Sequence, residues 1–196
     1  MKNILFYSIF IIFFNFFSAF GAEFKSLFGL KLYSDAGKYF KNSFINSNKF
    51  KNKETHDGFY DVEITEKIFI KNPFLSTYWI VLDEKNSIKQ ISAEEDMLDL
   101  NKCMDFKNYL IKVFTEKYTF FFTKKEYSHK DFYTHVHSTQ VDENKTLSVK
   151  CVESFTKEKI NLIISYESKV YRNRKKEFYE SGFWPFNLLN KLFQSS

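Results

Sequence analysis

The chain has 196 residues, of which 44% are hydrophobic and 20% aromatic, and its formal net charge at pH 7 is +5. This composition excludes an intrinsically disordered chain, and the length suits a single domain behind a short leader. The charge is mild and mixed in sign along the sequence, without the concentrated basic surface typical of nucleic-acid binders, so we expect no nucleic-acid partner.

Residues 1–21 have the pattern of a secretory signal peptide. Lys2 supplies a positive start, the stretch from Ile4 to Phe17 is mostly apolar, and Ala19 and Gly21 place small residues where signal peptidase cuts. We expect a leader helix that is removed, and therefore an exported protein in the periplasm or outside the cell. The alternative is an uncleaved anchor, because the apolar stretch is nearly long enough to cross a bilayer.

The first part of the mature chain predicts one helix and several strands. Residues 27–33 read as an extended segment, and Ser34 or Asp35 is suited to cap a helix that runs to about Ile45. Residues 46–58 read as a polar loop. Alternating apolar residues then predict strands, which lie at 60–64, 68–70, 77–82 and 87–92.

The strongest helical pattern follows an acidic cluster formed by residues 94–96 and Asp99. Acidic side chains stabilise a helix N-terminus, and we prefer this interpretation to a metal site. The helix carries apolar residues at a spacing of three or four: Cys103, Phe106, Leu110, Val113 and Phe114. The last third predicts strands at 118–123, 132–139, 147–152 and 160–170.

These elements predict one α+β domain over residues 22–177. We expect a meandering antiparallel sheet of about six to eight strands that packs one face on two α-helices, with the signal-peptide helix in front of the domain.

Two short segments resemble small exported bacterial domains of unknown function. One is Phe28-Gly29-Leu30-Lys31-Leu32, followed at once by a helix, and the other is the Cys103 helix as far as Tyr118. Such domains often have Gly where this chain has Tyr33. The resemblance implies a periplasmic address and no activity.

Two cysteines in an exported domain favour a disulfide bond. Cys103 lies on the apolar side of the predicted helix, and Cys151 shares the apolar face of a predicted strand with Leu147 and Val149. If that face packs on that helix, the two sulfurs can meet. The alternative is a pair of separate buried thiols.

No cofactor or catalytic motif is present. The five glycines are too far apart for a P-loop, a dinucleotide-binding fingerprint or a nucleophile elbow. His135 and His137 share a strand face and are the candidate metal ligands, with His129 nearby. We prefer to interpret them as polar residues on the solvated face of an edge strand, and we identify no catalytic residue.

Residues 178–196 form an aromatic, amphipathic tail behind the basic run 172–176. We expect the tail to dock on the domain's own sheet, on a partner or on a bilayer. Its docking side chains are Phe183, Trp184, Phe186, Leu189 and Phe193.

We expect a non-catalytic binding or envelope-associated domain, whose partner is an envelope protein or a small ligand. One alternative is a periplasmic hydrolase with a dispersed acid/base or histidine-based site. The other is a protein held at the membrane surface by its C-terminal tail.

Overall fold

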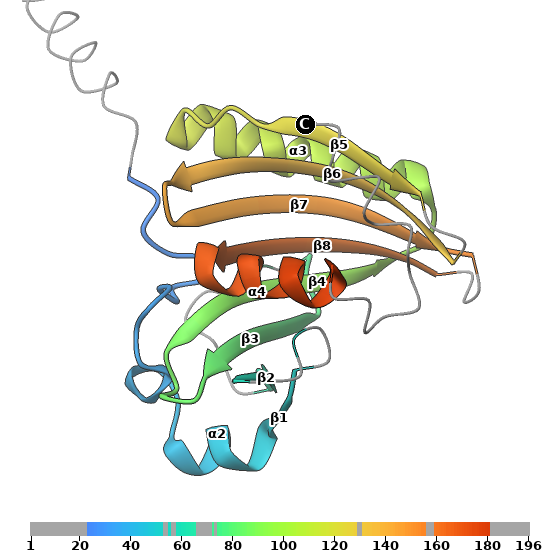
Figure 1. The fold of residues 1–196 in the computed structure, drawn as a ribbon. Helices are drawn as coiled ribbons and strands as arrows, with labels where there is room; N and C mark the ends of the chain where they lie inside the picture. Colours follow the sequence, from blue (N-terminus) through green and yellow to red (C-terminus); the bar gives the residue numbers. More distant parts are fainter. Residues whose placement is uncertain are drawn as a thin grey trace, which may run out of the picture.

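The structure is a computed structural model that describes residues 23–52, 55, 58–65, 72, 74–128, 131–155 and 159–180. These residues form an antiparallel eight-stranded sheet in the order β1-β2-β3-β4-β8-β7-β6-β5, together with three α-helices and a 3₁₀ turn (Figure 1). The predicted antiparallel α+β class is confirmed. The predicted leader helix lies outside the described residues.

The sheet consists of two four-stranded meanders, β1 to β4 and β5 to β8, joined where β4 pairs with β8. Helix α3 connects β4 to β5. The elements are η1 (Ala36–Lys38), α2 (Asn42–Asn48), β1 (Lys49–Lys51), β2 (Phe59–Glu63), β3 (Thr77–Asp83), β4 (Ile88–Met97), α3 (Leu100–Tyr118), β5 (Thr123–Ser128), β6 (Phe132–Asp142), β7 (Lys145–Ser154), β8 (Lys159–Ser168) and α4 (Lys169–Glu180).

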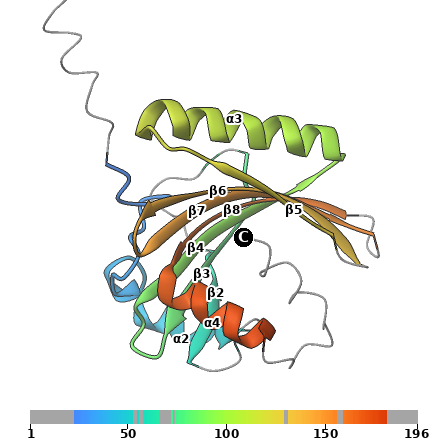
Figure 2. The ribbon, with the colours of Figure 1, turned by 45° about the horizontal axis from the view of Figure 1, so that its top comes forward.

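The two long helices lie on opposite faces of the sheet (Figure 2). Helix α3 packs on β4, β7 and β8 over the main core, to which alternate strand residues such as Ile91, Val149 and Ile164 contribute. Helix α4 packs on β4 and β8, and its Tyr171 forms a small second cluster with Phe59 and Val81. Helix α4 was not predicted, and it adds a layer on the face opposite α3. Buried residues of both predicted helical regions, such as Ile45 and Cys103, belong to the main core.

The acidic cluster precedes α3, as predicted, but only one of its residues lies at the helix N-terminus. Residues 94–96 belong to β4, where Glu94 is paired with Ile163 and Glu95 with Leu162 of β8. Only Asp99 caps the helix, and its side chain accepts a hydrogen bond from the Lys102 N–H at 2.8 Å. Backbone pairing with β8 thus determines the conformation of 94–96, rather than the helix dipole.

The first predicted helix is divided into η1 and α2. The Asp35 side chain accepts a hydrogen bond from the Gly37 N–H at 2.8 Å, which favours a tight 3₁₀ turn. Lys41 is extended, and the change of direction there allows both Phe40 and Ile45 to be buried. The polar loop predicted over 46–58 contains the short strand β1.

Two further predictions near the C-terminus are wrong. The aromatic run 118–123 is not a strand, because Phe120 packs on Phe24 and Phe122 on Phe114, and β5 starts at Thr123. The last strand was predicted to reach residue 170, but β8 ends at Ser168 and helix α4 begins at Lys169. The basic run 172–176 is part of this helix, which extends to Glu180. The predicted strand at 68–70 and the tail from residue 181 lie outside the described residues.

The predicted pairing of the cysteines is confirmed. Cys103 of α3 and Cys151 of β7 lie at disulfide-bonding distance, with 6.0 Å between their Cα atoms, and both are fully buried. The bond attaches the helix to an internal strand of the sheet. Among the described helices, none combines the length and the apolarity that crossing a bilayer requires.

Candidate functional site

A groove of about 750 Å³ opens where the start of β3 and the end of β4 meet the first half of α3. We call it the α3–β4 groove. Its lining residues are Phe74, Leu75, Ser76, Glu95, Asp96, Met97, Leu98, Lys102, Asp105, Phe106 and Tyr109.

One wall of the α3–β4 groove is aromatic. The ring centroids of Phe74 and Phe106 are 5.1 Å apart, and those of Phe106 and Tyr109 are 6.0 Å apart in a stacked arrangement. Large apolar side chains remain exposed there: Phe74 is 60% exposed, Tyr109 56% and Leu98 86%. A contiguous exposed apolar surface on a folded domain typically marks an interaction site.

A buried tyrosine positions the strand side of this wall. The Tyr78 hydroxyl donates a hydrogen bond to the Asn72 carbonyl at 3.1 Å and accepts one from the Asn72 N–H at 3.0 Å. The Asn72 side chain in turn accepts from the Phe74 N–H at 2.9 Å. This turn leaves Phe74 outside while Leu75 enters the core. Burial raises the pKa of Tyr78, and the Glu95 carboxylate adds to that rise.

The helix side of the α3–β4 groove is determined by the periodicity of α3. Lys102, Asp105, Phe106 and Tyr109 are spaced by three or four residues and therefore share one flank of the helix. This flank lies beside the stripe that faces the core, which contains Cys103, Lys107 and Leu110. The Asp99 cap starts the helix directly after Leu98 and leaves that leucine in solvent.

The groove contains carboxylates without cationic partners. Asp96 forms an ion pair with Lys159 at 2.8 Å, and Lys102 lies 3.8 Å from Asp99. Within the described part of the chain, neither the Glu95 nor the Asp105 carboxylate has a hydrogen bond or an ion pair. The described lining is therefore apolar with a net negative charge.

His135 and His137 share one face of β6, as predicted, but the face is the one that α3 covers. His135 lies opposite Cys151, and His137 lies opposite the buried Val149. Strand β6 is also internal, because β5 forms the edge of the sheet. These histidines are therefore not on the solvated face of an edge strand.

Glu126 joins the residues around His135. Its carboxylate accepts a hydrogen bond from the Tyr133 hydroxyl at 2.7 Å, forms an ion pair with Lys124 at 2.8 Å, and lies 3.2 Å from His135 Nδ1. These contacts, that of Lys124 first, lower the pKa of Glu126 to about 2. The hydrogen bond to Glu126 raises the pKa of Tyr133.

Lys107 is a fully buried residue of α3. It lies close enough to this cluster for the charges of Lys124 and Glu126 to act on its pKa. Neither Lys107 Nζ nor the buried Nδ1 of His137 has a hydrogen-bond partner among the described residues. Burial lowers the pKa of both groups, and the Lys124 charge lowers each further. No group of three or more histidine, cysteine, aspartate or glutamate side chains among the described residues is arranged to hold a metal ion.

The groove residues were not predicted as a site from the sequence. Tyr109 carries a signal, because it is a large aromatic residue off the core-facing stripe of its helix. Nothing in the sequence around Phe74 and Leu98 distinguishes them from ordinary core residues. The five docking residues of the tail, Phe183, Trp184, Phe186, Leu189 and Phe193, lie outside the described residues, as does His129.

The chain was also compared with known proteins. No model of a known protein family matches it, and no curated protein and no solved structure matches it either. Function is therefore inferred from the groove.

Proposed function

We propose that this protein is a non-catalytic binding domain that acts outside the cytoplasm and binds its ligand in the α3–β4 groove. The observation that carries the proposal is the exposure of Phe74, Leu98 and Tyr109 around one hollow. Fully burying a large apolar side chain stabilises by about 1.5–3 kcal/mol, so covering even part of this surface would give useful binding energy.

Export is supported by the leader pattern of residues 1–21 and by the cysteine pair. Disulfide bonds form and persist mainly in oxidising compartments. The Cys103–Cys151 pair is compatible with such a compartment. We propose the periplasm or the extracellular space as the place of action.

A hydrolase is the second candidate, because Glu95 and Asp105 bring two carboxylates to the groove. General acid–base catalysis needs such groups to be held in position by their neighbours. No described residue forms a hydrogen bond or an ion pair with either carboxylate. This arrangement favours binding over acid–base chemistry.

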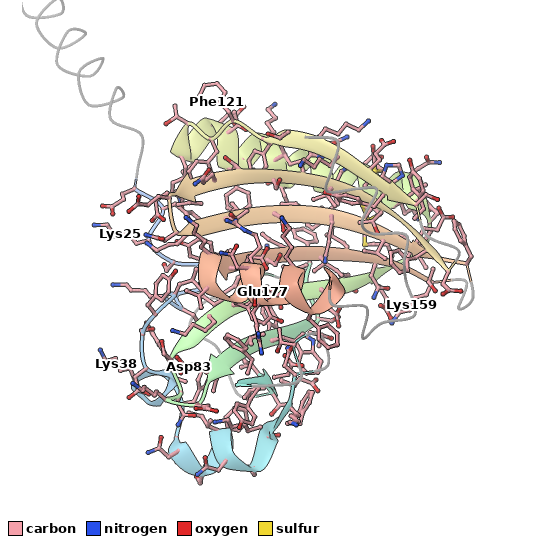
Figure 3. The ribbon with its side chains drawn as sticks, viewed as in Figure 1. Lys25, Lys38, Asp83, Phe121, Lys159 and Glu177 are labelled. Atoms are coloured by element: carbon pink, nitrogen blue, oxygen red, sulfur yellow. A yellow bond between two sulfur atoms is a disulfide. The ribbon has the colours of Figure 1, made fainter. Side chains whose placement is uncertain are left out.

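The neutral apolar dye Nile red tests the groove. We expect saturable fluorescence enhancement with the oxidised protein and a marked loss with Leu98→Ser. The matched control is Phe121→Ser, because Phe121 is 89% exposed and lies at the opposite end of the sheet from Lys159, the ion-pair partner of Asp96 (Figure 3). Equal loss in both variants, or no enhancement in the wild type, would contradict the proposal.

A further inference from the structure

The charge of the groove indicates what kind of ligand it takes. Resting on the proposed function, we infer that the α3–β4 groove binds a segment of a partner protein in which a large apolar side chain stands beside a lysine or arginine. The apolar side chain would contact Phe74, Phe106 and Tyr109, and the cation would be placed near Glu95 and Asp105.

The apolar half of this inference rests on the aromatic wall. Its rings are in contact with one another, with Phe74 from the strand side and Phe106 and Tyr109 from the helix. Rings held in this way offer a preformed surface, so binding loses little side-chain entropy. Leu98, which is 86% exposed, extends the same surface at the end of β4.

The cationic half rests on Glu95 and Asp105. Glu95 is half-buried on the α3 face of β4, opposite Leu162, and Asp105 is exposed on the groove flank of α3. Neither carboxylate has a cationic partner among the described residues, while Asp96 and Lys102 already have partners. A bound cation would lie between two unpaired negative charges and beside aromatic rings, which also attract cations.

The same charges disfavour other occupants. An anionic lipid surface or a nucleic acid would bring negative charge against Glu95 and Asp105, and like charges brought together oppose binding. A purely apolar ligand would leave both carboxylates unpaired and partly desolvated. A peptide segment that carries both an apolar and a basic side chain satisfies both parts of the groove.

Fluorescence anisotropy with three labelled peptides tests this inference on the oxidised full chain. The peptides share Gly-Ser flanks and differ only at the centre, which is Leu-Phe-Lys, Leu-Phe-Ser or Leu-Phe-Glu. We expect the lysine peptide to bind about two- to fivefold more tightly than the serine peptide, the range that an exposed charge pair supports. The glutamate peptide should bind most weakly, and added salt should reduce the differences.

Glu95→Gln and Asp105→Asn, combined in one variant, should bring the lysine and serine peptides to equal affinity. The control is Glu84→Gln in the β3–β4 turn, next to Asp83 and far from Lys159 in Figure 3, which should keep the preference. Equal binding of all three peptides by the wild type would overturn the charge inference and leave the binding proposal standing. Absence of binding by any peptide, together with absence of Nile red binding, would overturn the proposed function itself.

Discussion

The ring of Phe74, which precedes β3, lies 5.1 Å from the ring of Phe106 in α3. This contact joins the start of β3, in the first meander, to the helix that leads into the second. Phe74 nevertheless remains 60% exposed, so the contact does not complete a core. It forms one wall of the α3–β4 groove and leaves a surface for a ligand.

The disulfide bond should contribute much of the stability of the domain. The bonded cysteines are separated by 48 positions, and closing a loop of that size stabilises by about 4 kcal/mol in the chain-entropy model. We expect the double variant Cys103→Ala with Cys151→Ala to lose about that much unfolding free energy in urea titrations. A reducing agent should destabilise the wild type and leave the double variant unchanged. Two titratable thiols in the denatured, non-reduced wild type would contradict the bond.

Lys107 should destabilise the fold near neutral pH. Its pKa in the folded state is lowered, so between that value and the ordinary value of 10.5 the unfolded chain binds the proton more tightly. Lys107→Met keeps most of the side-chain volume and removes the amine. We expect it to stabilise the domain by about 1–3 kcal/mol near pH 7, because apolar replacement of a buried ionic group is often stabilising.

The gain from Lys107→Met should shrink as the pH rises toward 10.5 and vanish above it, where the wild-type amine is neutral in both states. Urea unfolding at neutral and alkaline pH measures both effects. Lys112→Met is the control, because Lys112 is on the exposed side of the same helix. The account fails if Lys107→Met is less stable than the wild type at both pH values.

Glu126 should stabilise the fold in a pH-dependent way. Its pKa is lowered from 4.5 to about 2 in the folded state, so the stabilisation is fully present above about 4.5 and is lost as the pH falls through about 2. Glu126→Gln should therefore lower the thermal midpoint above about pH 4.5, and the difference from the wild type should disappear over the acid range. A difference that is independent of pH would show that the Lys124, Tyr133 and His135 contacts do not lower this pKa.

Much of the fold follows from local patterns in the sequence. Alternation placed most of the strands, and the position of each cysteine on an apolar stripe was enough to predict their contact. Helix α4 was missed because its first residues were assigned to the preceding strand and its run 172–176 is highly charged. The buried Tyr171, the Arg172–Thr146 hydrogen bond and the Lys175–Glu167 ion pair attach it to the sheet. Lys107 was missed because its position between Cys103 and Leu110 shows burial only once the helix is docked.

The groove could not be predicted in the same way. Phe74 lies in the turn before β3, Glu95 in β4 and Phe106 in α3, and only the pairing of β3 with β4 and the docking of α3 bring them together. Exposure is also a tertiary property. In the sequence Phe74 and Leu98 look like the core residues Leu75 and Ile91, whereas in the structure they face solvent.

The leader should be removed on export. The small residues at positions 19 and 21 place the cut after Gly21, so the mature chain should begin at Ala22. Cleavage after Ala22, which would leave Glu23 as the first residue, would still support removal. Mass spectrometry of the protein isolated from its own cells measures this start. A species that begins at Met1 and fractionates with membranes would show an anchor instead.

The most direct test of the binding site is a titration of the isotope-labelled oxidised protein with the Leu-Phe-Lys peptide, followed by backbone amide chemical shifts. The account predicts saturable changes confined to residues 74–76 and 95–98 and to the stretch 102–109 of α3, which carries the helix residues that line the α3–β4 groove. Saturable changes that fall instead on the α4 face or along β5, with the groove amides unmoved, would contradict it.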